Sequence, residues 1–381
     1  MAIEELPSWD ASLLATAKSR LETDLADPAE HLRREAEDAL SAGPFSVVEK
    51  EILPPSGDAH DYHSRAGYYW PNPDTADGLP WVCRDGETNP TAADSDRGRL
   101  QEMAQAVETL ALASYFFDEE QYAERANLLL RTWFLDPETR MNPHLEFAQS
   151  IPGIWHGSGW GIVDTHSLVP VADSIALLDS LGALERTDSQ LLRGWFTAYL
   201  LWLLESDNGR LESTRPNNHA TAYDVQTSVF ARLGGNHYVA RRILGAVPEH
   251  RIGFQLEQGG KQMWEIARTS AFAYSVVNIN LFLTLGLLGT SYEIDLLGYQ
   301  SADGRSIRRS LEFLIPFALA EEEWRWERHR FEETAGNRFA GVLLKAAHAF
   351  GEPRYREVAG RFVHVDGERF SRDRTHLLYP P

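Results

Sequence analysis

Between positions 98 and 117, apolar residues recur with the i, i+3, i+4, i+7 spacing of one helical face. These positions are Leu100, Met103, Ala104, Val107, Leu110 and Ala111. The pattern predicts an amphipathic helix.

The next segment repeats this spacing and predicts a second helix. Its apolar positions are Tyr122, Ala123, Ala126, Leu129, Leu130 and Trp133. The pattern stops at Asp136 and Pro137, and a short turn at positions 118 to 120 separates it from the first helix. The two segments therefore predict a helical hairpin.

Further apolar helical runs lie near 167 to 183, 188 to 206, 218 to 233, 272 to 289, 305 to 319 and 337 to 349. Alternation typical of strands is scarce, and no dinucleotide or phosphate-loop glycine pattern is present. We therefore expect an all-α fold of successive helical hairpins. Because the runs have no fixed repeat period, the pattern favours an α/α toroid, an incomplete barrel, over a solenoid. No linker divides the chain, so we expect one domain over residues 1 to 381.

Three stretches interrupt the helical pattern and contain unusual polar and aromatic residues. They run from Tyr68 to Gly86, from Asn142 to Asp164 with the glycine-rich Gly157 to Gly161, and from Arg215 to His219. Loops on a rigid scaffold are common places for binding and catalytic residues.

The third stretch ends in a predicted helix start. Pro216 followed by Asn217 and Asn218 is typical of such a start, because an asparagine there can cap free backbone N–H groups. His219, Tyr223 and Gln226 then share one helical face. Asn218 and His219 would lie at the positive end of the helix dipole, which favours an anionic group. The alternative is a simple cap at Asn218 and a hydrogen-bonded core histidine at His219.

A second cluster lies between Glu265 and Tyr274. Arg268 and Tyr274 are six residues apart, which places them about 120° from a common face of an ideal helix. We therefore expect a loop or bend between them. The alternative is an arginine in a surface ion pair and a core tyrosine with a satisfied hydroxyl.

Composition narrows the possible partners. The formal charge of −20 argues against nucleic acid and anionic membranes as partners. We expect no apolar run near the roughly 20 residues that span a bilayer, and hence a soluble protein. An acidic ligand would require basic groups gathered at its site, and Arg65, Arg84, Arg215 and Arg268 are the candidates.

Cysteine and histidine usage indicates neither a disulfide nor a metal site. Cys83 is the sole cysteine, and we expect it to be a small packed side chain. The histidines are scattered along the chain, so we predict no metal and no cofactor. The first 20 residues lack the basic and apolar regions of a secretory signal. We expect a cytoplasmic protein, or a periplasmic or secreted one if a leader was removed.

Four segments resemble the alginate lyase family, helical-toroid enzymes that act on alginate, glucuronan and related polyuronates. They are GYYWPNPDTADGLPWVCRDGETNP (67 to 90), QSIPGIWHGSGWGIVDTHSL (149 to 168), NNHATAYDVQ (217 to 226) and EIARTSAFAYSVVN (265 to 278). The resemblance is best over residues 60 to 290. Ala220 and Ala222 replace a glycine and an aromatic residue of the family, and Ser270 and Ala271 replace a more basic or polar pair. These differences point to an altered substrate subsite.

The resemblance implies a polysaccharide lyase that cleaves a uronic-acid polymer or oligomer by β-elimination, leaving a 4,5-unsaturated uronate end. Asn218 and His219 match the family's Asn-His pair, Arg268 its active-site arginine and Tyr274 its catalytic tyrosine. A tyrosine with the usual pKa of about 10 is a poor base at neutral pH, and a nearby arginine would favour the phenolate.

Substrate contacts are expected from residues near these four. The candidates are Asn217, Tyr223, Gln149, His166, Arg215, Tyr68, Tyr69, Trp70, Trp160 and Arg84. The aromatic members could stack on sugar faces or could serve as core packing.

Two other functions remain open at this point. A glycoside hydrolase would need two carboxylates flanking the scissile bond, and Asp164, Asp224 and Glu265 are available. A non-catalytic protein could hold an acidic oligosaccharide without cutting it. The Asn-His and Arg-Tyr clusters favour the lyase, because hydrolysis and simple binding give them no evident role.

Overall fold

The computed structural model describes residues 5–92, 95–326, 333–362 and 372–381. They form two compact units, and the chain enters each unit more than once. The first unit comprises Met1–Pro7, Arg33–Thr214 and Val229–Asn236, and the second comprises Ser8–Leu32, Arg215–Ser228 and His237–Pro381. A single catalytic domain over residues 1 to 381 stays a prediction.

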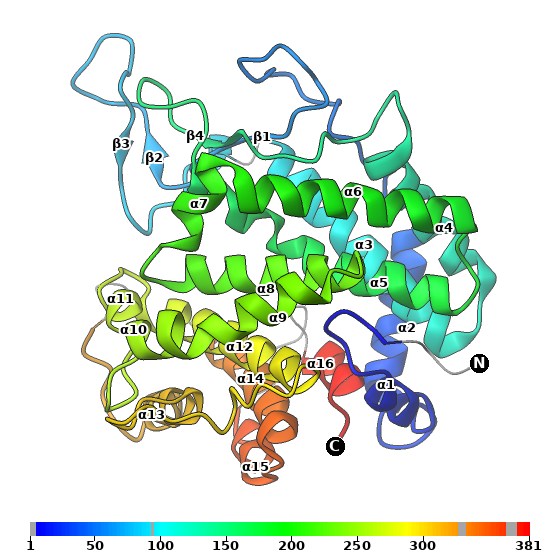
Figure 1. The fold of residues 1–381 in the computed structure, drawn as a ribbon, viewed down its shortest axis with the longest axis vertical. Helices are drawn as coiled ribbons and strands as arrows, with labels where there is room; N and C mark the ends of the chain where they lie inside the picture. The colour runs from blue at the N-terminus through cyan, green and yellow to red at the C-terminus, as the bar shows by residue number, and fades with distance from the viewer. Residues whose placement is uncertain (1–4, 93–94, 327–332, 363–371) are drawn as a thin grey trace. The chain divides into compact units, whose positions relative to one another are not determined.

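The first unit consists mainly of helices (Figure 1). Its helices are η1 (Pro90–Ala92), α3 (Asp96–Phe117), α4 (Glu120–Leu130), the π-helical η2 (Arg131–Leu135), the 3-10 helix η3 (Gly159–Ser167), α5 (Leu168–Ser180), α6 (Arg186–Glu205) and α7 (Asp207–Ser213). α3 packs on α4 and α5. The predicted hairpin is confirmed, since Asp118 ends α3 in a left-handed conformation with φ of 56° and η2 ends just before Asp136.

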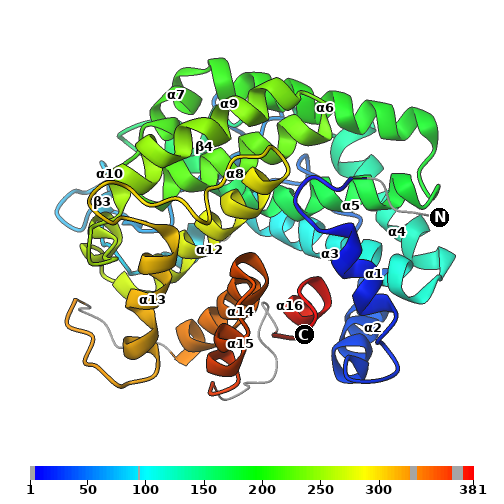
Figure 2. The ribbon, with the colours of Figure 1, turned by 60° about the horizontal axis from the view of Figure 1, so that its bottom comes forward.

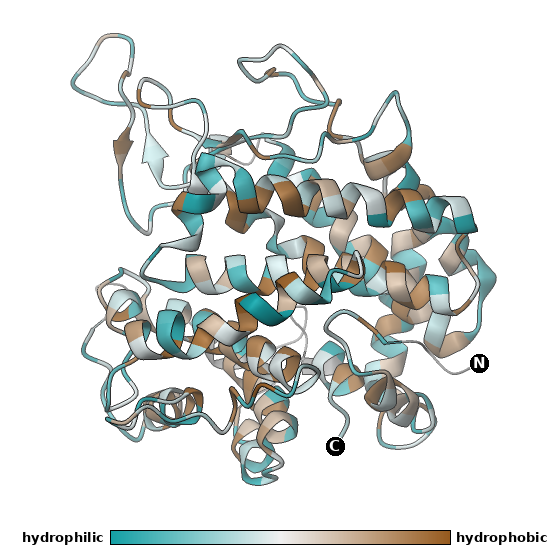
Figure 3. Cartoon of the chain, viewed as in Figure 1, coloured by the Kyte–Doolittle hydropathy of each residue, from teal (hydrophilic) through white to brown (hydrophobic). Residues whose placement is uncertain are grey.

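Apolar stripes on these helices build the core of the first unit. Figure 3 shows brown apolar and teal polar stripes alternating along α6. Trp195 and Phe196 on α6 are buried and pack against Phe134 of η2, with ring centroids 4.7 and 5.5 Å from that of Phe134. The helical run predicted near 188 to 206 is thus confirmed as α6, and its apolar face is buried.

Strands are few and short in the described part of the chain. β1 (His63–Arg65) pairs in parallel with β4 (Phe147–Ser150), and β2 (Tyr69–Trp70) pairs antiparallel with β3 (Val82–Cys83). β2, β3 and β4 lie in stretches that were expected to interrupt the helices, whereas β1 lies just before the first of those stretches. The all-α class is therefore confirmed, with small strand pairs confined to loops.

The second unit is also helical (Figure 2). Its elements are α1 (Ala11–Lys18), α9 (His237–Val247), the π-helical η4 (Pro248–Ile252), α10 (Gly253–Gln255), α11 (Met263–Ile266), α12 (Ala271–Thr290), α13 (Ile307–Ala318), α14 (Glu333–Phe350), α15 (Arg354–Ala359) and α16 (Arg372–Leu378). α12 packs on α13 and α14, and α14 packs on α15 and α16. Two further helices, α2 (Ala26–Leu40) and α8 (Asn218–Leu233), carry the chain from one unit into the other.

Two local expectations were wrong. The glycine-rich stretch is not wholly irregular, because η3 begins within it at Gly159. A Cβ atom on Gly161 would lie 2.2 Å from the side chain of Ala148, so only glycine allows η3 to approach β4 this closely. Cys83 is exposed on β3 rather than packed.

Two helical segments, Gly159–Ser180 and Ala271–Thr290, are long and apolar enough to cross a membrane by length and composition alone. This corrects the expectation that no apolar run approaches that length. Of the most apolar window in each segment, 78% and 67% are buried inside the protein, as in the core helices of soluble proteins. Their apolar character is therefore weak evidence for a membrane span.

Candidate active site

Asn218 is the first residue of α8. It is held by hydrogen bonds to the carboxylate of Glu265, which lies 47 residues further along the chain. The backbone N–H of Asn218 donates to Oε1 of Glu265 at 2.6 Å, and its side-chain Nδ2 donates to Oε2 at 2.7 Å. Asn218 is 4% exposed and Glu265 is 1% exposed. A simple helix cap binds backbone groups of its own helix. The side-chain nitrogen of Asn218 instead donates to Glu265 on α11.

His219, Tyr223 and Gln226 follow on the same continuous helix, so they share one face as the spacing predicted. His219 is half-buried, whereas Tyr223 and Gln226 are buried. Of these three side chains, His219 therefore has the most surface to offer a ligand.

Arg268 and Tyr274 meet across a break in the helices. α11 ends at Ile266 and α12 begins at Ala271, which confirms the predicted bend. Nη2 of Arg268 donates to the hydroxyl oxygen of Tyr274 at 3.2 Å, and the guanidinium carbon lies 4.3 Å from the ring centroid. Both side chains are half-buried. The guanidinium therefore stabilises negative charge on the phenolic oxygen.

A buried network of amides holds the start of α8 to the second half of this site. Oε1 of Gln255 accepts hydrogen bonds from Thr221 Oγ1 and Asn278 Nδ2, each at 3.0 Å. Nε2 of Gln255 donates to the carbonyl of Asn217 at 3.2 Å. The network joins α8 to α10 and α12, so it restrains the backbone that carries Asn217 and Asn218. Sequence reasoning did not single out Gln255, which lies in none of the four quoted segments, or Asn278, which is the last residue of the segment 265 to 278.

The three carboxylates available to a hydrolase are all bound by protein side chains. Asp224 accepts from Arg251 Nε at 2.8 Å and from Nη2 at 3.0 Å. Glu265 is bound by Asn218, as described above. In the first unit, Asp164 accepts from Ser64 Oγ at 2.7 Å and from the Tyr62 hydroxyl at 3.2 Å. None of the three is presented as a free acid or base, which argues against the hydrolase.

Gln149 lies in the first unit and has an unusual backbone. Its φ is 48°, which is uncommon for a residue other than glycine and is typically found where structure or function imposes it. The Gln149 backbone N–H donates to Ser64 Oγ at 2.8 Å, and its Nε2 donates to Asp164 Oδ1 at 3.0 Å. Asp164 therefore orients the side-chain amide of Gln149, and Ser64 holds its backbone.

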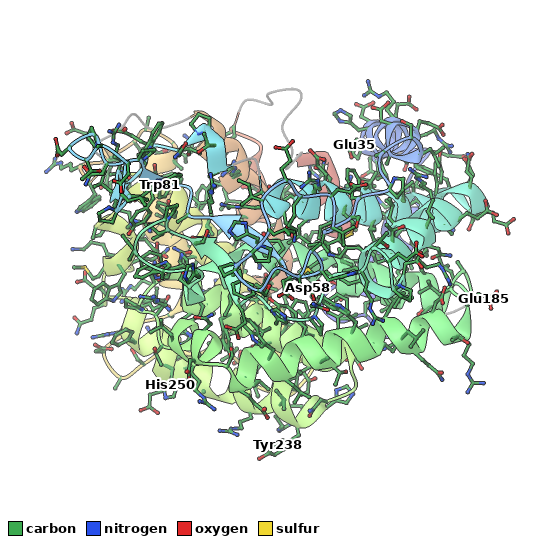
Figure 4. All side chains as sticks on the ribbon, turned by 90° about the horizontal axis from the view of Figure 1, so that it is seen from above. Glu35, Asp58, Trp81, Glu185, Tyr238 and His250 are labelled. Atoms are coloured by element: carbon green, nitrogen blue, oxygen red, sulfur yellow. The ribbon has the colours of Figure 1, made fainter. Side chains whose placement is uncertain are left out.

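The aromatic candidates of the first unit lie at β2, where the β2–β3 loop begins, and on η3. Arg84 lies over the ring of Trp70 at 5.2 Å, and Arg65 lies over the ring of Trp81 at 5.5 Å. Figure 4 labels Trp81 among the side chains of this loop. These pairs combine an apolar face with a positive charge, which suits an acidic sugar. Trp160 packs edge-on against Trp155 with ring centroids 5.3 Å apart.

The remaining candidates, Tyr68, Tyr69, His166 and Arg215, are all half-buried. Tyr68 and Tyr69 lie at β2 and His166 lies in η3, all in the first unit, whereas Arg215 lies in the second. Burial raises the pKa of Tyr69, and the neighbouring Cys83 raises it further. Tyr69 is therefore a neutral phenol at physiological pH.

The expectation of an altered substrate subsite fails at three of its four positions, and at the half-buried Ser270 it stays a prediction. Ala220, Ala222 and Ala271 are 0%, 2% and 0% exposed, so they pack in the interior and line no open surface. The residues that replace the family's usual side chains at these positions therefore affect packing rather than direct sugar contacts.

Among the described residues, no three His, Cys, Asp or Glu side chains are grouped closely enough to hold a metal ion. The absence of a metal from the reaction stays a prediction.

The family model described as alginate lyase matches residues 46–324 of this chain. A solved structure of an alginate lyase from Bacteroides ovatus is 34% identical, with 98% of this chain and 99% of that chain covered and a TM-score of 0.93. Alginate lyase A1-III from Sphingomonas species A1 is 13% identical, with 92% and 94% covered and a TM-score of 0.58. The second similarity concerns the fold alone. No protein with a curated description matches significantly.

These similarities confirm the α/α-toroid fold class predicted from the sequence. A variant of the Sphingomonas enzyme has also been solved in complex with a tetrasaccharide.

Proposed function

The chain belongs to the alginate lyase family and is a polysaccharide lyase, and from that premise we propose that Asn218, His219, Arg268 and Tyr274 cleave an alginate-type polymer by β-elimination. The contact between Arg268 and the Tyr274 hydroxyl carries the proposal. It gives a tyrosine the charged neighbour that an acid–base role requires.

The reaction begins at carbon 5 of the uronate next to the scissile bond. Removing its proton places charge on the adjacent carboxylate, and this developing dianion makes the step difficult. Asn218 donates a hydrogen bond to that carboxylate, and the positive charge of Arg268 adds to its stabilisation. Preorganised donors of this kind typically contribute about 3 to 4 kcal/mol to the transition state.

The electron pair of the broken C5–H bond then forms the C4–C5 double bond, and the bond from C4 to the glycosidic oxygen breaks. In mannuronate the proton and the leaving oxygen lie on the same side of the ring, so Tyr274 takes the proton and returns one to the leaving oxygen. In guluronate they lie on opposite sides. His219 then takes the proton, and Tyr274 protonates the leaving oxygen.

An ultraviolet assay against mannuronan, guluronan, glucuronan and a hyaluronan-type polymer tests the proposal. Elimination creates a conjugated double bond that absorbs, whereas hydrolysis adds water and creates none. We expect absorbance to rise with mannuronan or guluronan. New reducing ends without absorbance would contradict elimination, and absorbance with glucuronan alone would contradict alginate as the substrate.

Substitution of His219 by alanine separates the two stereochemical routes. General base catalysis contributes about 10²- to 10⁴-fold, so we expect a loss of this size on guluronan and a much smaller loss on mannuronan. The measurement is kcat on both polymers with the same preparation. The ratio of kcat on guluronan to kcat on mannuronan is its own control, because a folding defect lowers both rates equally. Equal losses on the two polymers would show that His219 is not the base for guluronate.

A further inference from the structure

Glu265 lies beside the proposed catalytic groups without being one of them. Its two oxygens accept from two donors of one residue, the backbone N–H and the side-chain Nδ2 of Asn218. At 1% exposure it has no surface on which to meet a sugar. The carboxylate of Glu265 therefore binds Asn218 and not the sugar.

The two hydrogen bonds from Asn218 require that both side-chain oxygens of Glu265 act as acceptors. An ionised carboxylate accepts at both positions, whereas a protonated carboxyl or an amide would point a donor at one of the two Asn218 donors. The two bonds also fix the plane of the Asn218 amide, because the backbone and the side chain are held by the same rigid group. The directions of the second N–H bond of Nδ2 and of the Oδ1 atom of Asn218 are thereby fixed.

We propose that Glu265 is a positioning residue of the lyase reaction, whose ionised carboxylate holds the Asn218 amide in the orientation that donates to the substrate carboxylate. This inference rests on the role proposed for Asn218. It assigns to Glu265 a function in elimination rather than the acid or base role of a hydrolase.

The position of Glu265 on α11 links it to the other half of the site. The backbone N–H of Arg268 donates to the carbonyl of Glu265 at 3.0 Å, at the turn that leads to the Arg268–Tyr274 pair. One short helix thus holds Asn218 through a side chain and places Arg268 through its backbone. Glu265 and Arg268 are three residues apart, so this single turn connects them.

Charged and titratable neighbours affect the ionisation of Glu265. Burial raises its pKa, and the two hydrogen bonds from Asn218, together with His219 on α8 and Arg268 beyond α11, act in the opposite direction without cancelling the effect of burial. The functional form is the ionised one. It is therefore lost on acidification at a higher pH than for an ordinary glutamate, and the acid side of the kcat profile reflects this loss.

A double-mutant cycle tests the inference. In the natural background, Glu265→Gln should lower kcat about 10- to 100-fold. In the Asn218→Ala background the same change should cost less than about threefold, because the group it positions is gone. The acid limb of kcat should also move to lower pH in Glu265→Gln. An equal loss in both backgrounds, or natural kcat in Glu265→Gln, would overturn the inference.

Asp224→Asn is the matched control, because Asp224 is a second buried carboxylate of the same unit with a raised pKa and a different partner. It should lower the thermal midpoint while leaving kcat per folded molecule and the acid limb unchanged. If Asp224→Asn lowers kcat as Glu265→Gln does, the effect of Glu265 is structural and the inference fails. Natural activity in Asn218→Ala alone would instead contradict the proposed function, so the two failures are distinguishable.

Discussion

Replacement of Tyr274 by phenylalanine should lower kcat about 10³-fold or more on mannuronan. The substitution removes one hydroxyl that acts as both base and acid on that polymer, and each proton transfer contributes about 10²- to 10⁴-fold. The ring and its packing remain, so the thermal midpoint should change little. The ultraviolet assay measures turnover, and calorimetry with an alginate tetrasaccharide should show that binding persists.

Tyr238→Phe is the control for this prediction. Tyr238 lies on α9, is 75% exposed and is labelled in Figure 4, so its hydroxyl should not affect the reaction. Near-natural turnover in Tyr274→Phe would refute the acid–base role of Tyr274. Loss of tetrasaccharide binding together with turnover would indicate that the hydroxyl acts in binding instead.

Substitution of Asn218 by alanine should lower kcat about 10²- to 10³-fold, the usual cost of removing one donor from a preorganised anion site. It also removes one of the two donors to the buried carboxylate of Glu265. A buried acceptor that loses its partner costs about 1 to 3 kcal/mol, so the free energy of unfolding should fall as well. Kinetics on oligosaccharides and chemical denaturation measure the two effects separately.

Asn208→Ala provides a comparison for Asn218→Ala. The amide of Asn208 on α7 makes a long 3.5 Å hydrogen bond to Glu146, and Asn208 has no place in the proposed reaction. Its loss should change neither kcat nor stability appreciably. If Asn218→Ala lowers stability but leaves kcat unchanged, Asn218 serves the fold and not the transition state.

The boundaries of the predicted helices followed closely from the sequence, although α1, α2 and α9 were not predicted. The apolar run at positions 218 to 233 corresponds to α8, and the run at 272 to 289 corresponds to α12 with one added residue at each end. The spacing of apolar residues predicts these helices because each helix buries one face or most of its surface. The apolar positions indicate which face is buried. The short strands β1 to β4 escaped prediction because two to four residues are too few to show an alternating pattern.

The candidate site was predictable in part. The bend between Arg268 and Tyr274 followed from helical geometry, and the structure adds the contact between the two side chains. The role of Glu265 did not follow, because a lone glutamate in sequence can be an acid, a base, an ion-pair partner or a hydrogen-bond acceptor. Only its partner and its burial distinguish these possibilities.

The sequence by itself determined the helical class, the positions of most long helices, the break before Pro137 and the segments that resemble the family. Each of these depends on local spacing or on short motifs, which a linear chain carries directly. The tertiary structure alone decided that Asn218 binds Glu265 and that Ala220 lies in the interior. Such contacts join residues far apart in the chain. They depend on the distance and direction between side chains and on the exclusion of water, and the local periodicity of the sequence contains no information about these.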